Sequence, residues 1–225
     1  MPAQRKDDTI RRILDGNARW AANPASVTNL NATWEVDAFG VPPQHPCILW
    51  IGCADSRVPE SVIAGGSRPG EIFVHRNIAN QIHLDDDNAL SVLEYGVDHL
   101  DILDVVVVGH TDCGGVAAAF DAAFPPSCSS NPKPSTPISR WIKALTKLAK
   151  SLPTPLPPRD RALLRLVEAN VKAQVTNLAS TDIIKEAWKK YKTGEKCAVY
   201  IHGWVYDLET RKIRDLRITR GPPGA

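Results

Sequence analysis

Four consecutive valines, Val105 to Val108, constrain the fold of this chain more than any other feature. Valine favours extended backbone, and an unbroken apolar run predicts a strand that is buried on both faces. Strands of this kind occur in parallel sheets that helices cover on both sides. The run therefore predicts an α/β fold.

The remaining pattern is consistent with such a fold. Two more apolar runs predict buried strands at residues 47–51 and 71–75. Apolar residues at helical spacing predict helices at residues 9–22, 88–100, 139–150, 159–178 and 180–191, with another after Gly115. Two final strand candidates, 197–206 and 212–219, predict an antiparallel edge hairpin. We expect a mainly parallel central sheet flanked by helices, with a C-terminal antiparallel edge hairpin and an N-terminal helical arm.

The size of the chain favours one domain. Its 225 residues are 43% hydrophobic, which is enough for a single well-buried core. We expect one domain over residues 1–225, with the helical arm at about residues 1–40 and the α/β core at 41–225. The apolar face of the arm helix is expected to pack on the core or on a second subunit.

Composition argues against several classes of partner. The net charge is only +2 and the basic residues are scattered, so nucleic acid is not an expected partner. No run of 18 apolar residues predicts a membrane span. The N-terminus lacks an apolar signal core, and acidic residues interrupt its arginines. We therefore expect a cytoplasmic protein, in preference to a mitochondrial one.

The cysteines number five, at positions 47, 53, 113, 128 and 197. An odd number in a chain of this length fits metal-binding or buried thiols better than a disulfide framework. Cys53 follows one predicted strand, whereas His110 and Cys113 follow the valine strand. If those strands are parallel neighbours, their carboxyl ends bring the three side chains together at one edge of the sheet.

Two thiolates and one imidazole suit zinc, and three ligands leave the fourth position open, as in catalytic zinc sites. Each residue also has a simpler explanation: a cysteine at a strand end is commonly a small buried apolar residue, and a histidine after Gly109 can end a turn. The combination at matching strand ends favours a metal site. One Zn²⁺ per chain is expected.

Asp55 and Arg57 follow the first cysteine at intervals of two residues. In an extended or sharply turned segment, these side chains lie on the same side of the chain as Cys53. They can then reach the open face of the metal, where Asp55 is a possible fourth ligand. Gly114 and Gly115 allow close backbone approach at the start of a helix, and their amides can donate to an anion there.

The run Cys-x-Asp-x-Arg at residues 53–57, followed by His-x-x-Cys-Gly-Gly at 110–115, resembles the β-class carbonic anhydrases. Further segments resemble the same family in the same order, at residues 17–20, 51–60, 69–71, 73–77, 79–80 and 202–207. The resemblance extends over roughly residues 10–220. It implies that Cys53, His110 and Cys113 bind zinc and that Asp55 and Arg57 are the catalytic pair.

The resemblance also implies a substrate pocket and an assembly. The expected pocket residues are Gln44, Phe73, Ile78, Tyr95 and Gly114. Relatives supply some of these from the neighbouring subunit, so a homodimer or a homotetramer is expected. A subset of the family is regulated by bicarbonate in a second pocket, which here would consist of Trp50, Arg76 and Tyr206. In that subset the aspartate leaves its arginine and occupies the fourth zinc position.

The implied activity is the reversible hydration of carbon dioxide to bicarbonate and a proton. In the expected reaction a zinc-bound hydroxide, oriented by Asp55 and Arg57, attacks the carbon. The same ligands would also suit hydrolysis of carbon disulfide or carbonyl sulfide. A non-catalytic, zinc-containing bicarbonate sensor is the alternative of another class, against which the intact Asp55 and Arg57 argue.

Overall fold

The computed structural model describes residues 7–22, 44–65, 69–125 and 135–224. Contacts between Cα atoms divide the chain into two units: residues 1–45 with 68–70, and residues 46–67 with 71–225. Most of the proline-rich segment at 125–137 lies outside the described residues.

In the second unit the strands form one sheet in the order β2-β1-β3-β4-β5. The strands are β1 (Ile48–Cys53), β2 (Ile72–Asn77), β3 (Asp104–His110), β4 (Tyr200–Asp207) and β5 (Lys212–Arg220). Strands β2, β1, β3 and β4 run parallel, and β5 pairs antiparallel with β4 at the edge. The predicted mainly parallel sheet with an antiparallel C-terminal edge is therefore confirmed.

The helices of this unit connect the strands. They are α3 (Glu60–Ile63), α4 (Asp87–Glu94), α5 (Gly114–Ala123), α6 (Pro137–Trp141), α7 (Lys143–Lys150), α8 (Arg159–Ser180) and α9 (Asp182–Lys192). The helix expected over residues 88–100 ends instead in a π turn at Tyr95–His99. The helix expected over 139–150 is two helices, because the backbone leaves the helical conformation at Ile142 (φ −84°, ψ 9°).

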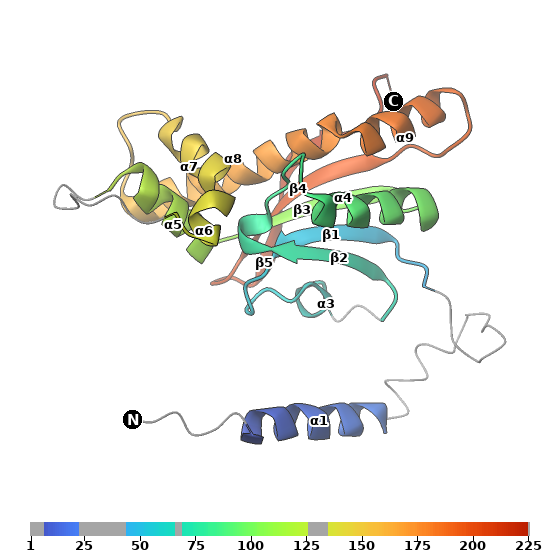
Figure 1. Ribbon diagram of the computed structural model, residues 1–225, viewed down its shortest axis with the longest axis horizontal. Helices are drawn as coiled ribbons and strands as arrows, with labels where there is room; N and C mark the ends of the chain where they lie inside the picture. The colour runs from blue at the N-terminus through green and yellow to red at the C-terminus, as the bar shows by residue number, and fades with distance from the viewer. Residues whose placement is uncertain (1–6, 23–43, 66–68, 126–134, 225) are drawn as a thin grey trace. The chain divides into compact units, whose positions relative to one another are not determined.

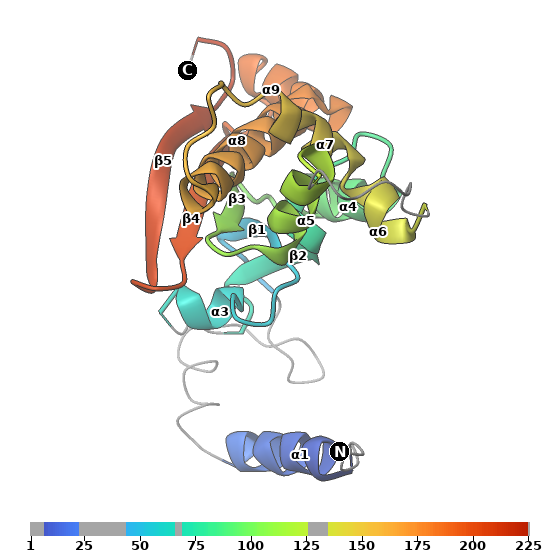
Figure 2. The same cartoon turned by 90° about the vertical axis from the view of Figure 1, so that its left-hand side faces the viewer.

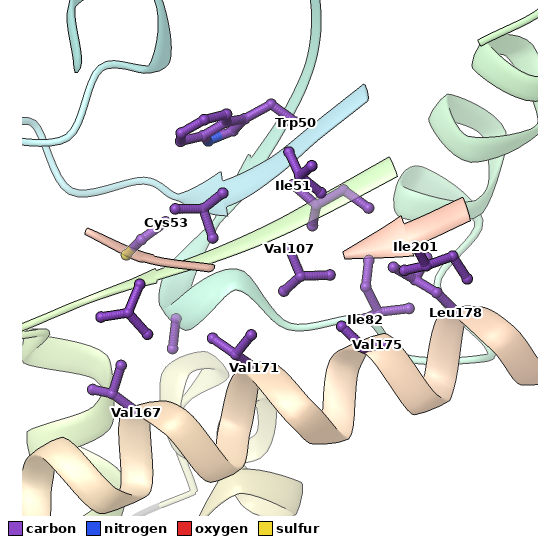
Figure 3. Close-up of a cluster of buried hydrophobic side chains, with 14 of the residues drawn as sticks. Trp50, Ile51, Cys53, Ile82, Val107, Val167, Val171, Val175, Leu178 and Ile201 are labelled. Carbon is purple, nitrogen blue, oxygen red and sulfur yellow. The ribbon is translucent and has the colours of Figure 1, made fainter. Parts of the chain in front are cut away.

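On one face of the sheet, α8 packs on β3, β4 and β5 and α4 packs on β2, whereas only the short α3 lies on the side of the other face (Figures 1 and 2). Figure 3 shows Val167, Val171 and Val175 of α8 directed at the sheet. Two strand glycines permit this close packing, because a Cβ atom at Gly109 or Gly203 would lie 2.7 or 2.9 Å from a methyl carbon of Val171. Helix α8 therefore packs directly on β3 and β4, close to the carboxyl end of β3, where His110 lies.

The described part of the first unit contains α1 (Asp7–Ala21). Its apolar residues Ile10, Ile13 and Leu14 are exposed, at 56%, 57% and 64% of their surface. What covers this face stays a prediction. Among the described residues, no helix is both long and apolar enough to cross a membrane.

Candidate metal centre

The three predicted metal ligands meet at one edge of the sheet. Cys53 is the last residue of β1 and His110 is the last residue of β3, and these two strands are parallel neighbours. Cys113 follows a short turn and is the N-cap of α5. The sequence predicted that all three ligands would lie just after the ends of their strands. Cys53 and His110 are instead the last residues of β1 and β3. Parallel pairing alone therefore brings residues 57 positions apart into contact.

The distances within this group suit a tetrahedral ion. The sulfur atoms of Cys53 and Cys113 lie 3.9 Å apart, and both thiols are free. With Zn–S bonds of about 2.3 Å, tetrahedral geometry places two sulfur ligands about 3.8 Å apart. The candidate ligand atoms of Cys53, His110 and Cys113 all lie within 4.8 Å of one another. The spacing therefore fits zinc and is far too long for a disulfide.

His110 is held ready for a metal. Its Nδ1 atom lies 2.8 Å from the carbonyl oxygen of Thr111, which places the proton on Nδ1 and leaves the lone pair on Nε2. The side chain is 1% exposed, and Nε2 has no hydrogen-bond partner among the residues that the structure describes. A buried nitrogen without a partner is costly, and a metal ion at Nε2 would remove that cost.

The charges of the group also favour a cation. Hydrogen bonding with Cys113 lowers the pKa of the Cys53 thiol to about 4. The same bond, together with burial, raises the pKa of Cys113. Burial alone would lower the pKa of His110, but the Cys53 sulfur more than reverses this. The pair thus ionises only once by itself, because two adjacent buried thiolates repel each other. A divalent cation would stabilise both thiolates.

Asp55 and Arg57 form a forked ion pair beside the ligands. Arg57 donates from Nε to Oδ1 at 3.0 Å and from Nη2 to Oδ2 at 2.7 Å, and its backbone N–H donates to Oδ1 at 2.9 Å. The pair lowers the pKa of Asp55 to about 2. Oδ2 also lies 3.9 Å from Nε2 of His110. The carboxylate therefore faces the metal position while it remains bound to Arg57.

Asp112 anchors Arg57 from the opposite loop, a role that the sequence analysis missed. Nη1 of Arg57 donates to Oδ2 of Asp112 at 3.0 Å, and Nη2 donates to its carbonyl oxygen at 3.0 Å. Asp112 lies between two predicted ligands and has a left-handed backbone (φ 55°). Its position inside the His-x-x-Cys run was the only available signal. Arg57 thus links the segment that follows Cys53 to the turn between His110 and Cys113.

The residues predicted to hold regulatory bicarbonate do not form a single open pocket. Trp50 and Tyr206 line a small cavity together with Cys53 and His110, but it has no room for a water molecule. Arg76 does not line that cavity. Its guanidinium donates to the carbonyl oxygens of Cys53 and Asp55, at 2.7 and 2.5 Å, and pairs with Glu60 at 3.5 Å. In this conformation Arg76 stabilises the backbone between Cys53 and Asp55.

The predicted substrate-pocket residues fall in four places. Ile78 is exposed and lines a cavity of about 610 Å³ that also includes Ala54, next to the first ligand. Gly114 opens α5, and a Cβ atom there would meet nothing within 4 Å. Gln44 belongs to the first unit, so its role stays a prediction.

Phe73 and Tyr95 stack on each other, with ring centroids 5.9 Å apart. They lie away from the ligands of their own chain. Phe73 pairs in register with Leu49, four residues before Cys53, which corresponds to roughly 13 Å along the strand. This stack cannot line the metal site of the same chain by direct contact.

Comparisons with known proteins find similar proteins of one family. The carbonic anhydrase family, as a sequence model, matches residues 48–213. A carbonic anhydrase of Emericella nidulans is 32% identical over 220 residues, which cover 94% of this chain and 85% of that protein. A tetrameric β-carbonic anhydrase of Sordaria macrospora is similar in structure, with a TM-score of 0.74 and 29% identity over 95% of this chain and 100% of that one. The β-carbonic anhydrase of Coccomyxa in complex with acetazolamide gives a TM-score of 0.74 at 30% identity, covering 93% and 86% of the two chains.

Proposed function

Since the chain belongs to the β-class carbonic anhydrase family, we propose that it hydrates carbon dioxide reversibly through a zinc site completed by Asp55 and Arg57. The predicted family and enzyme class are confirmed by these relatives. Zinc is the cofactor of the family, and the Cys53, His110 and Cys113 group fits it. The observation that carries the proposal is this group, with a charged carboxylate facing its open side.

Zinc bound here would supply a Lewis acid that makes a water molecule acidic enough to act as hydroxide near pH 7. Asp55 would accept a hydrogen bond from the attacking oxygen and so direct its lone pair toward the substrate carbon. Arg57 holds both oxygens of Asp55, and Asp112 holds Arg57, so the carboxylate cannot rotate freely. His110 is fixed in the tautomer that a metal ligand requires.

The proposed role of Asp55 predicts a specific kinetic result. Stopped-flow hydration of carbon dioxide at pH 8.5 should show activity in the zinc-loaded protein. Asp55→Ala should keep its zinc and lose about 100-fold or more in kcat/KM, within the range for a positioned acid or base. Carbonyl sulfide and carbon disulfide serve as comparison substrates. Activity on these alone would change the assigned substrate, and full activity of Asp55→Ala would remove Asp55 from the mechanism.

We further propose regulation by bicarbonate through Trp50, Arg76 and Tyr206. Such regulation requires a rearrangement. In the structure the Arg76 guanidinium donates a hydrogen bond to the carbonyl oxygen of Cys53, and the cavity beside Trp50 has no room for a ligand. Release of the loop would free Asp55 to leave Arg57 and take the fourth metal position. Carbon dioxide hydration at pH 7, measured with and without added bicarbonate, tests this. An unchanged rate in a bicarbonate series would contradict it.

The assembly and the location of the protein are also proposals. A relative is tetrameric, and the stack of Phe73 and Tyr95 lies far from the ligands of its own chain. Both observations support a dimer or tetramer in which neighbouring subunits complete each other's pockets. The proposed location is the cytoplasm.

A further inference from the structure

A cavity of about 380 Å³ lies between α8 and the edge strand β5, bounded by residues 165–172 and 214–218. Helix α8 and β5 lie side by side (Figure 2). Ile218 belongs to the lining and faces the α8 side of the sheet, since a Cβ atom at Gly203 would contact both Ile218 and Val171. Small-molecule sites have volumes of roughly 300–1,000 Å³, so this cavity is large enough for a ligand. We call it the α8–β5 cleft.

The charged residues of the α8–β5 cleft are mostly cationic. The cationic ones are Arg165, Lys172, Arg214 and Arg217, and the anionic ones are Glu168 and Asp215. This excess of positive charge equals the net charge of +2 of the entire chain. In the sequence these basic residues are far apart, and only the packing of α8 beside β5 brings them together.

Both anionic groups of the cleft already have partners. Glu168 accepts a hydrogen bond from Nη2 of Arg214 at 2.5 Å, which joins α8 to β5. Oδ1 of Asp215 accepts from the backbone N–H of Arg217 at 2.7 Å. The two carboxylates are therefore engaged, one by a guanidinium and one by the backbone.

Three cations of the cleft lack a partner. Among the residues that the structure describes, the side chains of Arg165, Lys172 and Arg217 form neither a hydrogen bond nor an ion pair. Cations gathered around one cavity repel each other, and a bound anion would remove that repulsion. The cleft therefore has the charge and the unused donors of an anion site.

Arg217 reaches the cleft through a bulge in β5. The register between β4 and β5 shifts between Gly203 and Trp204, so that residues 216 and 217 have no partner in β4. Arg217 is left-handed there, with φ 55°, a conformation that a Cβ atom disfavours. Bulges bend a strand and redirect its side chains. This one gives Arg217 its place in the lining at a cost in backbone free energy.

The basic residues of β5 also have a simpler explanation, but it does not extend to α8. Basic side chains on an edge strand discourage pairing with other chains. Arg165 and Lys172 belong to a helix and cannot serve that purpose, yet they line the same cavity. Protection of the edge therefore does not account for cations that two separate elements bring together.

We propose that the α8–β5 cleft binds an oligophosphate anion, either free or at the end of a nucleotide. A guanidinium group can donate two parallel hydrogen bonds to phosphate oxygens, and a lysine adds a point charge. Several cations around one cavity suit an anion with several charged groups better than a singly charged one. The proposal goes beyond the zinc site and does not depend on it, because no residue of the cleft is a candidate metal ligand.

The test measures binding of inorganic tripolyphosphate to the full chain by isothermal titration calorimetry at low ionic strength. We expect one tripolyphosphate per chain with a Kd below about 1 mM. Added NaCl should weaken this binding, because salt screens exposed charges. Inorganic phosphate should bind at least about tenfold more weakly, since it offers fewer charged oxygens to the cations. A Kd for tripolyphosphate above about 1 mM would overturn the proposal.

Arg165→Gln is compared with Arg161→Gln. Arg161 lies one turn earlier on α8 and is exposed, but it does not line the cleft. We expect Arg165→Gln to weaken tripolyphosphate binding about tenfold or more, because a charge-assisted hydrogen bond is lost. Arg161→Gln makes the same change in net charge and should alter the Kd by less than about twofold. Equal weakening in both variants would mean general attraction to a basic surface and would overturn the cleft.

A second matched pair tests the strand side. Arg217→Gln should weaken binding as Arg165→Gln does, whereas Arg220→Gln on the same strand, outside the lining, should not. Thermal unfolding shows whether each variant is folded, and Lys172→Gln replaces any cleft variant that is not. Unchanged binding in the folded cleft variants would overturn the proposal.

ATP distinguishes the two sources of the anion, because it carries a chain of three phosphates on a nucleoside. A lower Kd for ATP than for tripolyphosphate would identify a nucleotide as the ligand. An equal or higher Kd would identify the free oligophosphate. Either result supports the α8–β5 cleft only if Arg165→Gln weakens the tighter of the two interactions.

Discussion

The Arg57 guanidinium donates hydrogen bonds to Oδ1 and Oδ2 of Asp55, at 3.0 and 2.7 Å, while Oδ2 also lies 3.9 Å from Nε2 of His110. In the proposed mechanism, the pair leaves the fourth metal position to an outside ligand and supplies a fixed acceptor beside it. Movement of Asp55 into that position would break both side-chain hydrogen bonds to Arg57.

Arg57 orients Asp55 more than it ionises it. Its hydrogen bonds lower the pKa of Asp55 from 3.8 to about 2, but either value leaves the carboxylate ionised near neutral pH. Because the folded value is depressed, the pairing stabilises the protein above about pH 4 and is lost as the pH falls toward 2. Between pH 6 and 9 this contribution is constant.

Arg57→Lys tests this conclusion. Lysine keeps the charge but cannot donate in a fork. We expect kcat/KM to fall about tenfold or more at every pH from 6 to 9, with the midpoint of its pH profile unchanged. Stopped-flow profiles of both proteins provide the measurement. A displaced midpoint with an unchanged plateau would show instead that Arg57 acts on ionisation.

Substitution of a metal ligand should affect zinc content and activity, whereas substitution of a cysteine outside the site should not. Cys53→Ser or His110→Ala should lose zinc and activity together, since each removes one of the three candidate ligands found among the described residues. Cys197→Ser is the matched control, because this thiol is free and exposed. It should retain zinc at one ion per chain, as determined by metal analysis after dialysis. An active variant of Cys53 or His110 without zinc would refute the assignment.

Sequence reasoning found the residues whose position depends on strand pairing. Cys53 and His110 end parallel neighbours, so the valine run and a shorter apolar run were enough to bring them together. The antiparallel C-terminal edge was also predictable, because its two strands are joined by a short connection. These features depend on periodicity, which a single sequence displays.

Features that depend on backbone dihedrals were not predictable. Ala79 is left-handed although it is not a glycine, the residue that usually indicates this conformation in a sequence. Asn170 is one polar residue on a long helix, and its contacts cannot be read from that pattern. The predicted regulatory role of Arg76 did not reveal its bonds to the carbonyl oxygens of Cys53 and Asp55. Such contacts join segments far apart in the chain and follow no period.

The paired glycines at the start of α5 should respond differently to alanine. A Cβ atom at Gly115 would lie 2.8 Å from a methyl carbon of Ile78 and 3.0 Å from Cβ of Ala79, whereas one at Gly114 would meet nothing. We expect Gly115→Ala to cost about 1–3 kcal/mol of stability, as overpacking does, and to weaken zinc binding. Gly114→Ala should unfold at an equal or slightly higher urea concentration. Equal losses in both variants would contradict the packing argument.

The stack of Phe73 and Tyr95 allows a test of shared pockets between subunits. In its own chain Phe73 pairs with Leu49, roughly 13 Å along β1 from Cys53, so it cannot serve that site directly. If it completes the pocket of a neighbour, then Asp55→Ala and Tyr95→Ala damage different parts of each composite site. In a mixed dimer one site carries both defects and the other carries neither.

Equal amounts of the Asp55→Ala and Tyr95→Ala proteins, dissociated and reassembled together, should therefore recover activity that neither has alone. Random pairing makes half of the dimers mixed, with one intact site in each, so about a quarter of the unaltered activity is expected. The separately reassembled proteins are the controls. Activity equal to the average of those controls would mean that Tyr95 acts within its own chain, because no intact site would then form.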